Sequence, residues 1–127
     1  MKYLWIILLL FTFSFADDHK EEHHHYYSKD LSYLNLSHEQ QKGIKKVLKE
    51  YRKKLKLYRE FKKDTIRSKQ KLFEQDNFNQ KALIDLDIRL VERAAQIEAG
   101  LLSNIHQALT KEQRALFIKH IDEWEIE

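Results

Sequence analysis

The chain has 127 residues, of which 34% are charged and 43% are hydrophobic, and its formal net charge is +3 with histidine neutral. It contains no proline and only two glycines, a composition that favours a single domain of long helices over sandwiches, barrels and glycine-rich phosphate loops. It also contains no cysteine, which excludes disulfide scaffolds, thiol nucleophiles, iron–sulfur clusters and cysteine-ligated zinc, so a metal site would need histidine and carboxylate ligands.

Residues 1–16 have the pattern of a secretory signal peptide. Lys2 supplies a positive charge, residues 3–13 are predominantly apolar, and Ser14 and Ala16 are the small residues that a signal peptidase reads. The apolar run is shorter than the roughly 18 to 20 residues that span a bilayer, which disfavours a retained membrane anchor. We therefore expect cleavage after Ala16 and a mature protein located in the periplasm, with no stable membrane insertion.

Residues 17–30 have no apolar periodicity, and we expect them to form a flexible arm. Four histidines and four carboxylates fall within nine positions of this arm: Asp17, Asp18, His19, Glu21, Glu22, His23, His24 and His25. Imidazole and carboxylate together suit zinc, nickel or copper. Two interpretations stay open: the four histidines bind a metal, or the arm is a solubilising tail in which such residues happen to cluster.

Residues 31–127 have the periodicity of a helical domain. A short helical turn is expected at 31–34. Ser37 and Gln40 are the residue types of a capping box, in which the hydroxyl accepts from the N–H three residues later and the Gln side chain returns to the cap. A helix is predicted from there to about Glu74, because apolar side chains recur every three or four residues.

Turn-forming residues at 76–79 are predicted to reverse the chain. Asn79 is an N-cap for a second helix that ends near Ala108 and has the most regular apolar spacing in the sequence. A second capping box, Thr110 to Gln113, opens a short third helix. Its apolar residues are predicted on one side: Leu116, Phe117, Ile121 and Trp124.

The predicted fold class is all-α, a long antiparallel helical hairpin with short flanking helices. A two-helix hairpin covers only one side of each apolar stripe, and the third helix is too short to cover the rest. We therefore expect a second copy of the chain to complete the core as a homodimer. Gly100 lies inside the second helix, where it marks either a close helix crossing or tolerated drift.

Positive charge is concentrated in the first long helix. Residues 42–71 contain 14 lysines and arginines against three acidic residues, a local net charge of +11. Such a helix attracts acidic partners over about a Debye length, whereas a merely solvated face usually mixes charges of both signs. Nucleic acid is the usual partner of such a face in a cytosolic protein, but the signal peptide argues against nucleic acid here.

Aromatic residues lie among these cations at helical spacing. Tyr51, Tyr58 and Phe61 either contact apolar segments of a bound chain or form the hairpin core. No nucleophile, base or carboxylate pair in an arrangement typical of an enzyme is found, so we expect a non-enzymatic protein. The residues assigned to binding non-native chains are Lys45, Lys49, Arg52, Lys56, Arg59, Tyr51 and Phe61.

Two segments, 36–40 and 109–113, share the pattern Leu-Ser/Thr-x-x-Gln, one before the first long helix and one after the second. The pattern resembles the twice-repeated Leu-Thr-x-x-Gln motif of the Spy/CpxP family of periplasmic stress proteins, and the resemblance extends over residues 31–124. In that family the motif residues fasten helix ends. The matching positions here are Leu36, Ser37, Gln40, Leu109, Thr110 and Gln113.

The resemblance implies a cradle-shaped, all-helical homodimer whose positively charged concave face holds unfolding proteins without ATP. The expected function is therefore that of a chaperone-like protein that binds unfolded envelope proteins and requires no cofactor. One alternative is a zinc-, nickel- or copper-binding resistance or sensor protein, and another is a regulator of an envelope-stress sensor kinase. His19 and His23 have the His-x-x-x-His spacing of the family's metal sensors, but no Met accompanies His106 before the second motif, which weakens the sensor hypothesis.

Overall fold

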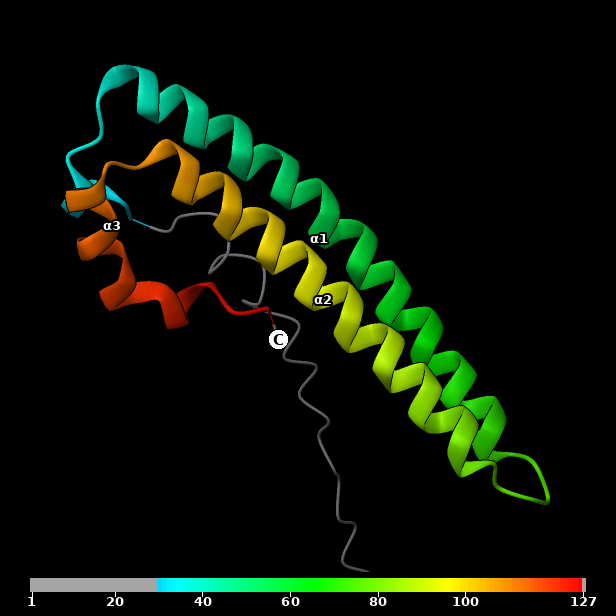
Figure 1. The fold of residues 1–127 in the computed structure, drawn as a ribbon. Coiled ribbons are helices and arrows are strands. Elements are labelled where there is room, and N and C mark those ends of the chain that lie inside the picture. Colours follow the sequence, from blue (N-terminus) through cyan, green and yellow to red (C-terminus); the bar gives the residue numbers. More distant parts are fainter. Residues whose placement is uncertain (1–29, 127) are drawn as a thin grey trace, which may run out of the picture. The chain divides into compact units, whose positions relative to one another are not determined.

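A computed structural model describes residues 30–126, and one compact unit begins at Leu31. The predicted signal peptide and nearly all of the histidine-rich arm lie outside the described residues. No strand occurs within residues 30–126, so the predicted all-α class is confirmed. The elements in chain order are η1 (Ser32–Leu34), α1 (His38–Phe73), α2 (Gln80–Ala108), α3 (Lys111–Phe117) and η2 (Ile118–Trp124) (Figure 1).

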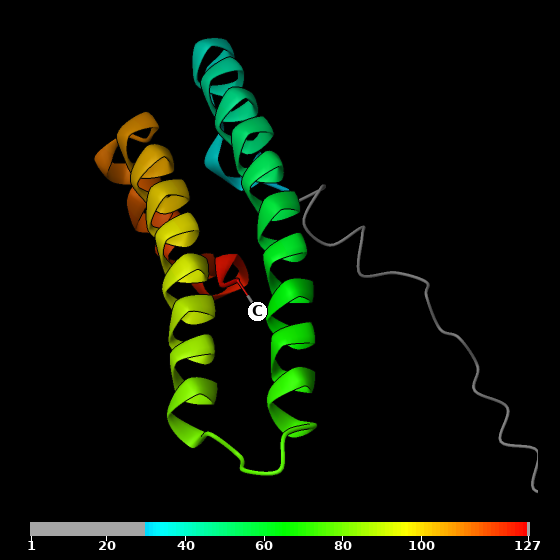
Figure 2. The ribbon, with the colours of Figure 1, turned by 90° about the vertical axis from the view of Figure 1, so that its right-hand side faces the viewer.

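Helices α1 and α2 lie side by side and run antiparallel, which confirms the predicted hairpin (Figures 1 and 2). They contain 36 and 29 residues, which corresponds to lengths of about 54 and 44 Å. The predicted helix boundaries are confirmed to within a residue, because α1 follows its N-cap Ser37 and α2 follows its N-cap Asn79. The Asn79 Oδ1 atom accepts a hydrogen bond from the Ala82 N–H at 3.0 Å, which satisfies an otherwise unpaired amide of the first turn.

The core lies in the half of the hairpin nearer to the chain ends. The core residues of α1 recur at intervals of three, four or seven residues and therefore lie on one side of the helix. No residue between Ile66 and Gln96 is buried, so the half nearer the turn is covered incompletely. The buried hydrophobic residues of the two long helices are Ile44, Tyr51, Leu55, Tyr58, Ile97, Leu101 and Ile105.

The C-terminal segment folds back against the hairpin. Phe117 and Trp124 are buried, and their ring centroids are 5.6 Å apart. The Ile126 N–H donates a hydrogen bond to Glu98 Oε2 at 3.3 Å, which joins the end of the described chain to the middle of α2. The segment therefore covers one side of the core that α1 and α2 leave open (Figure 1).

The predicted apolar side of the third helix is only partly correct. Leu116 and Ile121 are exposed, whereas Phe117 and Trp124 are buried. The α-helix ends at Phe117 and continues as a 3-10 helix, which has three residues per turn in place of 3.6. The 3.6-residue period that predicted a common side for Phe117, Ile121 and Trp124 therefore does not hold after Phe117.

Neither glycine is required by packing. A Cβ atom built on Gly100 would have the Lys54 Nζ atom as its nearest neighbour, at 3.9 Å, and one built on Gly43 would meet nothing within 4 Å. A separation of 3.9 Å is an ordinary van der Waals contact. Gly100 therefore does not mark a close crossing of α2 with another helix.

Candidate functional site

Both Leu-Ser/Thr-x-x-Gln segments form capping boxes, as predicted. Ser37 Oγ accepts from the Gln40 N–H at 3.1 Å, and the Ser37 N–H donates to Gln40 Oε1 at 2.9 Å. The corresponding distances between Thr110 and Gln113 are 3.2 and 2.9 Å. Each box satisfies two groups at a helix start that would otherwise lack intrahelical partners.

The two capping boxes also contact each other. Gln40 Nε2 donates to Gln113 Oε1 at 2.7 Å, and Gln113 Nε2 donates to Gln40 Oε1 at 3.1 Å. The same nitrogens donate to the carbonyl oxygens of Ala108, at 2.8 Å, and Leu34, at 3.1 Å. This amide pair joins the starts of α1 and α3 to the end of α2 and to η1. The leucines of the two motifs, Leu36 and Leu109, are half-buried and buried respectively.

The basic stripe consists of Lys45, Lys49, Arg52, Lys56 and Arg59 on α1. Their spacing of three and four residues places them on one side of the helix. Arg59 is half-buried and the other four residues are exposed. Within residues 30–126, Lys45, Lys49, Lys56 and Arg59 have no carboxylate partner.

The acidic residues of α1 between residues 42 and 71 do not neutralise the basic stripe, because each pairs with a cation three residues later. The hydrogen bond and the charge of Lys53 lower the pKa of the Glu50 carboxyl group below its ordinary value. The three pairs are Glu50–Lys53 at 3.0 Å, Glu60–Lys63 at 3.2 Å and Asp64–Arg67 at 2.8 Å.

The two aromatic residues assigned to binding have different environments. Tyr51 is 5% exposed and belongs to the hairpin core, which is one of the two interpretations that the sequence left open for it. Phe61 is half-buried, and the guanidinium carbon of Arg93 lies 4.5 Å from the centroid of its ring. This is a cation–π contact between α1 and α2. Phe61 therefore lies at the boundary between the core and the surface.

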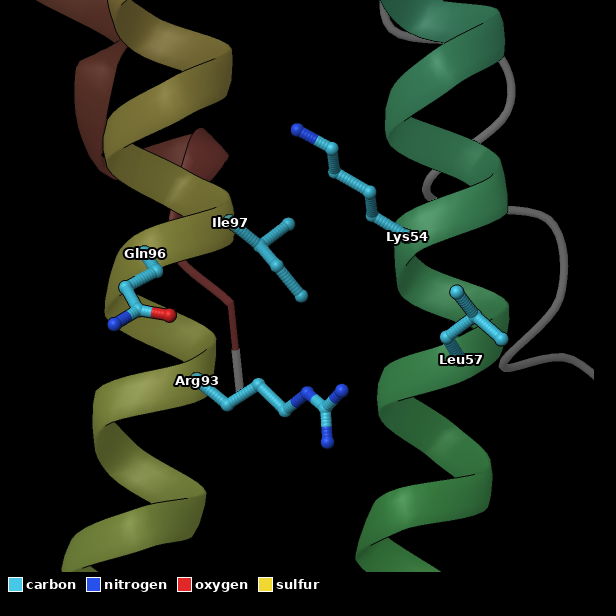
Figure 3. A pocket seen from close by; sticks show the side chains of 5 residues that line it. All are labelled: Lys54, Leu57, Arg93, Gln96 and Ile97. Carbon is cyan, nitrogen blue, oxygen red and sulfur yellow. The ribbon is translucent and has the colours of Figure 1, made fainter.

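A hollow of about 220 Å³ opens between the two long helices. Lys54 and Leu57 line it from α1, and Arg93, Gln96 and Ile97 line it from α2 (Figure 3). The side chains of Lys54 and Arg93 extend into the gap from opposite helices, and the C-terminal segment runs behind the helices in this view (Figure 3). Sequence reasoning missed this hollow, because the register of the two helices decides which residues meet.

The apolar stripe is a row of exposed hydrophobic side chains on α2. It consists of Ile84, Ile88 and Val91, which are 56%, 50% and 66% exposed. Glu98 lies two turns after Val91 on the same side of α2. Its carboxylate accepts a hydrogen bond from the Ile126 N–H of the C-terminal segment. That segment thus covers this side of α2 at Glu98 and leaves the apolar stripe uncovered.

The structure does not place the predicted metal ligands, because His19, His23, His24 and His25 precede the described residues. Within residues 30–126, no group of three or more histidine and carboxylate side chains is placed to hold a metal ion. The same part of the chain has no helix with the length and apolar character needed to cross a bilayer.

No family model, curated protein or solved structure matches the chain. The resemblance to the Spy/CpxP family is therefore carried by the repeated motif, with one copy at the start of α1 and the other at the start of α3.

Proposed function

We propose that the protein is a periplasmic, ATP-independent chaperone that binds non-native envelope proteins through the basic stripe and limits their aggregation. The observation that carries the proposal is the charge of this stripe. It spans about four turns of an exposed helix, and Lys45, Lys49, Lys56 and Arg59 have no carboxylate partner within residues 30–126. A surface of one sign raises the local concentration of oppositely charged chains and the rate at which they bind.

Exposed apolar side chains give the proposed surface a second, salt-resistant contribution. Leu57 and Ile66 of α1 are exposed. An unfolded chain exposes apolar side chains that a native protein buries, so such contacts favour non-native over native proteins. Binding of this kind needs no nucleotide, because a bound chain is released when it folds and buries its own apolar surface.

We further propose that a second copy of the chain covers the apolar stripe. The half of the hairpin that carries it has no buried residue between Ile66 and Gln96, and the C-terminal segment reaches only as far as Glu98. Packing the stripes of two copies against each other around a two-fold axis would bury Ile84, Ile88 and Val91 of both. The basic stripe of α1 is composed of other residues and stays available for binding.

The test is suppression of the aggregation of an acidic protein diluted from urea, measured by light scattering. Suppression is expected to fall as salt rises to about 0.5 M, because the Debye length shrinks to a few ångströms. The variant in which Lys49, Arg52, Lys56 and Arg59 are all changed to Gln is expected to lose most of its activity at low salt. It should stay folded, because the other three cations are exposed and contribute little to stability, and Gln keeps part of the aliphatic stem of the half-buried Arg59.

A matched control separates the basic stripe from net charge. Changing Lys81, Arg89, Lys111 and Lys119 to Gln removes the same four charges from exposed positions elsewhere, and this variant is expected to keep the activity of the wild-type chain. Full activity of the stripe variant, together with full activity of the wild-type chain at high salt, would contradict the proposal. Equal losses in both variants would mean that net charge, and not the stripe, governs capture.

A further inference from the structure

We propose that residues 118–126 form a displaceable strap, and that the surface beneath it binds an extended segment of a non-native protein through an aromatic side chain and a backbone N–H. The strap folds back from α3 toward the middle of the hairpin (Figure 1). The inference rests on the proposed function in one respect only, which is that a non-native chain supplies the ligand. The residues involved belong neither to the basic stripe nor to the apolar stripe, so the strap can be tested independently.

The strap itself shows what the surface beneath it can hold. Trp124 is 2% exposed, and the centroid of its ring lies 5.6 Å from that of Phe117. The 3-10 helix ends at Trp124, the backbone of Glu125 is extended, and the next N–H, that of Ile126, donates to Glu98 Oε2 at 3.3 Å. A buried aromatic ring and a backbone N–H two residues later are groups that an unfolded polypeptide with an aromatic residue can also supply.

The strap is held less firmly than the helix that precedes it. Helix α3 is fastened at its start by its capping box and by the amide pair of Gln40 and Gln113. In contrast, η2 is a 3-10 helix of seven residues, and its poorer hydrogen-bond geometry makes runs longer than about four residues uncommon. Its Ile118 and Ile121 side chains are 63% and 45% exposed. The apolar burial of the strap therefore depends mainly on Trp124.

A competing segment can replace these contacts one for one. An incoming aromatic ring takes the place of Trp124, and an incoming N–H takes the place of the Ile126 N–H at Glu98, so the exchange loses neither buried ring nor hydrogen bond. The site accepts a ligand only in chains whose strap is open, and its apparent affinity falls in proportion to that fraction. The strap thus excludes weak ligands and covers the site again when a bound protein folds and buries its own aromatic residue.

The fluorescence of Trp124 reports the strap directly, because Trp124 is the one tryptophan in residues 17–127. The probe is acetyl-Asn-Gln-Phe-Gln-Ile-Gln-amide, a neutral analogue of residues 122–127 that contains no tryptophan. We expect it to shift the emission of Trp124 saturably to longer wavelength while the far-ultraviolet circular dichroism stays helical, and we expect its Phe-to-Ser counterpart to have no effect. Calorimetric binding of the Phe peptide without the emission shift, or no binding, would overturn the inference.

Matched variants test the role of the strap as a competitor. Trp124→Ser opens the strap and should bind the Phe peptide about tenfold more tightly in calorimetry, as expected if about one chain in ten is open in the wild type. Ile121→Ser changes an exposed position of the same strap and should leave the affinity unchanged. A folded Trp124→Ser chain that binds no more tightly than Ile121→Ser would refute the inference.

A covalent lock tests the same point without removing the buried ring. The chain has no cysteine, so Ala95→Cys and Glu125→Cys introduce a unique pair at exposed positions. Ala95 is a helical neighbour of Glu98, and Glu125 directly precedes the Ile126 N–H that Glu98 accepts. Linking the pair with a flexible bismaleimide should abolish binding of the Phe peptide, whereas capping both thiols with N-ethylmaleimide should not. Equal affinities of the linked and capped chains would contradict a displaceable strap.

The outcomes also separate this inference from the proposed function. A chain that suppresses aggregation but whose linked and capped forms bind the Phe peptide equally refutes the strap alone. A chain whose strap is displaced by the Phe peptide but that does not suppress aggregation refutes the chaperone proposal and leaves the strap standing.

Discussion

The amide pair between Gln40 and Gln113 is expected to contribute strongly to stability, and Gln113→Ala is the simplest perturbation of it. The Gln113 side chain accepts from the Thr110 N–H, exchanges hydrogen bonds with the Gln40 amide in both directions, and donates to the Leu34 carbonyl oxygen. Truncation removes all of these hydrogen bonds at once. It also leaves the partly buried Leu34 carbonyl and Gln40 amide without these partners.

The magnitude follows from the net value of a single hydrogen bond, about 0.5–1.5 kcal/mol. Water reaches part of this site, so we expect Gln113→Ala to lower the free energy of unfolding by about 2–4 kcal/mol, a large share of the total of about 5–15 kcal/mol for a domain. Gln40→Ala should cost a similar amount. The double variant should cost about 1–2 kcal/mol less than the sum of the single changes, because both remove the same mutual hydrogen bonds.

Urea unfolding followed by far-ultraviolet circular dichroism measures these free energies. An unchanged slope of the free energy of unfolding against urea concentration would show that only stability has changed. Gln41→Ala is the matched control. Its exposed side chain makes one hydrogen bond, to the Leu36 carbonyl oxygen at 3.3 Å, and its loss should cost less than about 0.5 kcal/mol. The predicted role of the amide pair would be wrong if Gln113→Ala cost no more stability than Gln41→Ala, or if the costs of Gln40→Ala and Gln113→Ala were additive.

Further predictions concern the helix interiors, the core, the assembly and the arm. Gly43→Ala and Gly100→Ala should each raise the free energy of unfolding by about 0.5–1 kcal/mol in urea titrations; a loss at Gly100 would indicate a steric requirement there. Tyr51→Ser should lower the free energy of unfolding by about 3–5 kcal/mol because the ring is buried. An unchanged midpoint of urea unfolding would indicate that Tyr51 belongs to the binding surface and not to the core. Sedimentation equilibrium at micromolar concentration should show a dimer for the wild-type chain and a monomer for Ile88→Lys; a folded wild-type monomer would exclude the proposed assembly. If the arm binds metal, calorimetric titration of the mature chain with zinc, nickel or copper should give saturable heat that is lost when the four arm histidines become Ala, and heat unchanged by that substitution would place binding elsewhere.

Most of the fold could be predicted from the sequence because its determinants are local. The boundaries of α1 and α2 follow from side chains that cap the adjoining turn, Ser37 and Asn79, together with an apolar period that continues without a proline. The 3-10 helix after Phe117 was not predicted, since the burial of Trp124 against Phe117 is a tertiary contact with no local signal.

The candidate site was predicted less completely because it depends on contacts between distant residues. The charge of the basic stripe could be read directly from the spacing of Lys45 to Arg59. The sequence showed Gln40 and Gln113 as separate caps, but their contact depends on how the hairpin closes. The hollow formed by Lys54 and Arg93 likewise depends on the register of α1 against α2.

The most direct test of the central claim is site-specific photo-crosslinking to a non-native acidic protein. A photoreactive phenylalanine analogue is placed at Lys49 or Lys56 within the basic stripe, and at Lys81 or Lys111 as exposed controls elsewhere. We expect crosslinks from the two stripe positions that weaken as salt rises, and few from the controls. Equal crosslinking from all four positions, or crosslinks from the stripe that do not depend on salt, would contradict capture by the basic stripe.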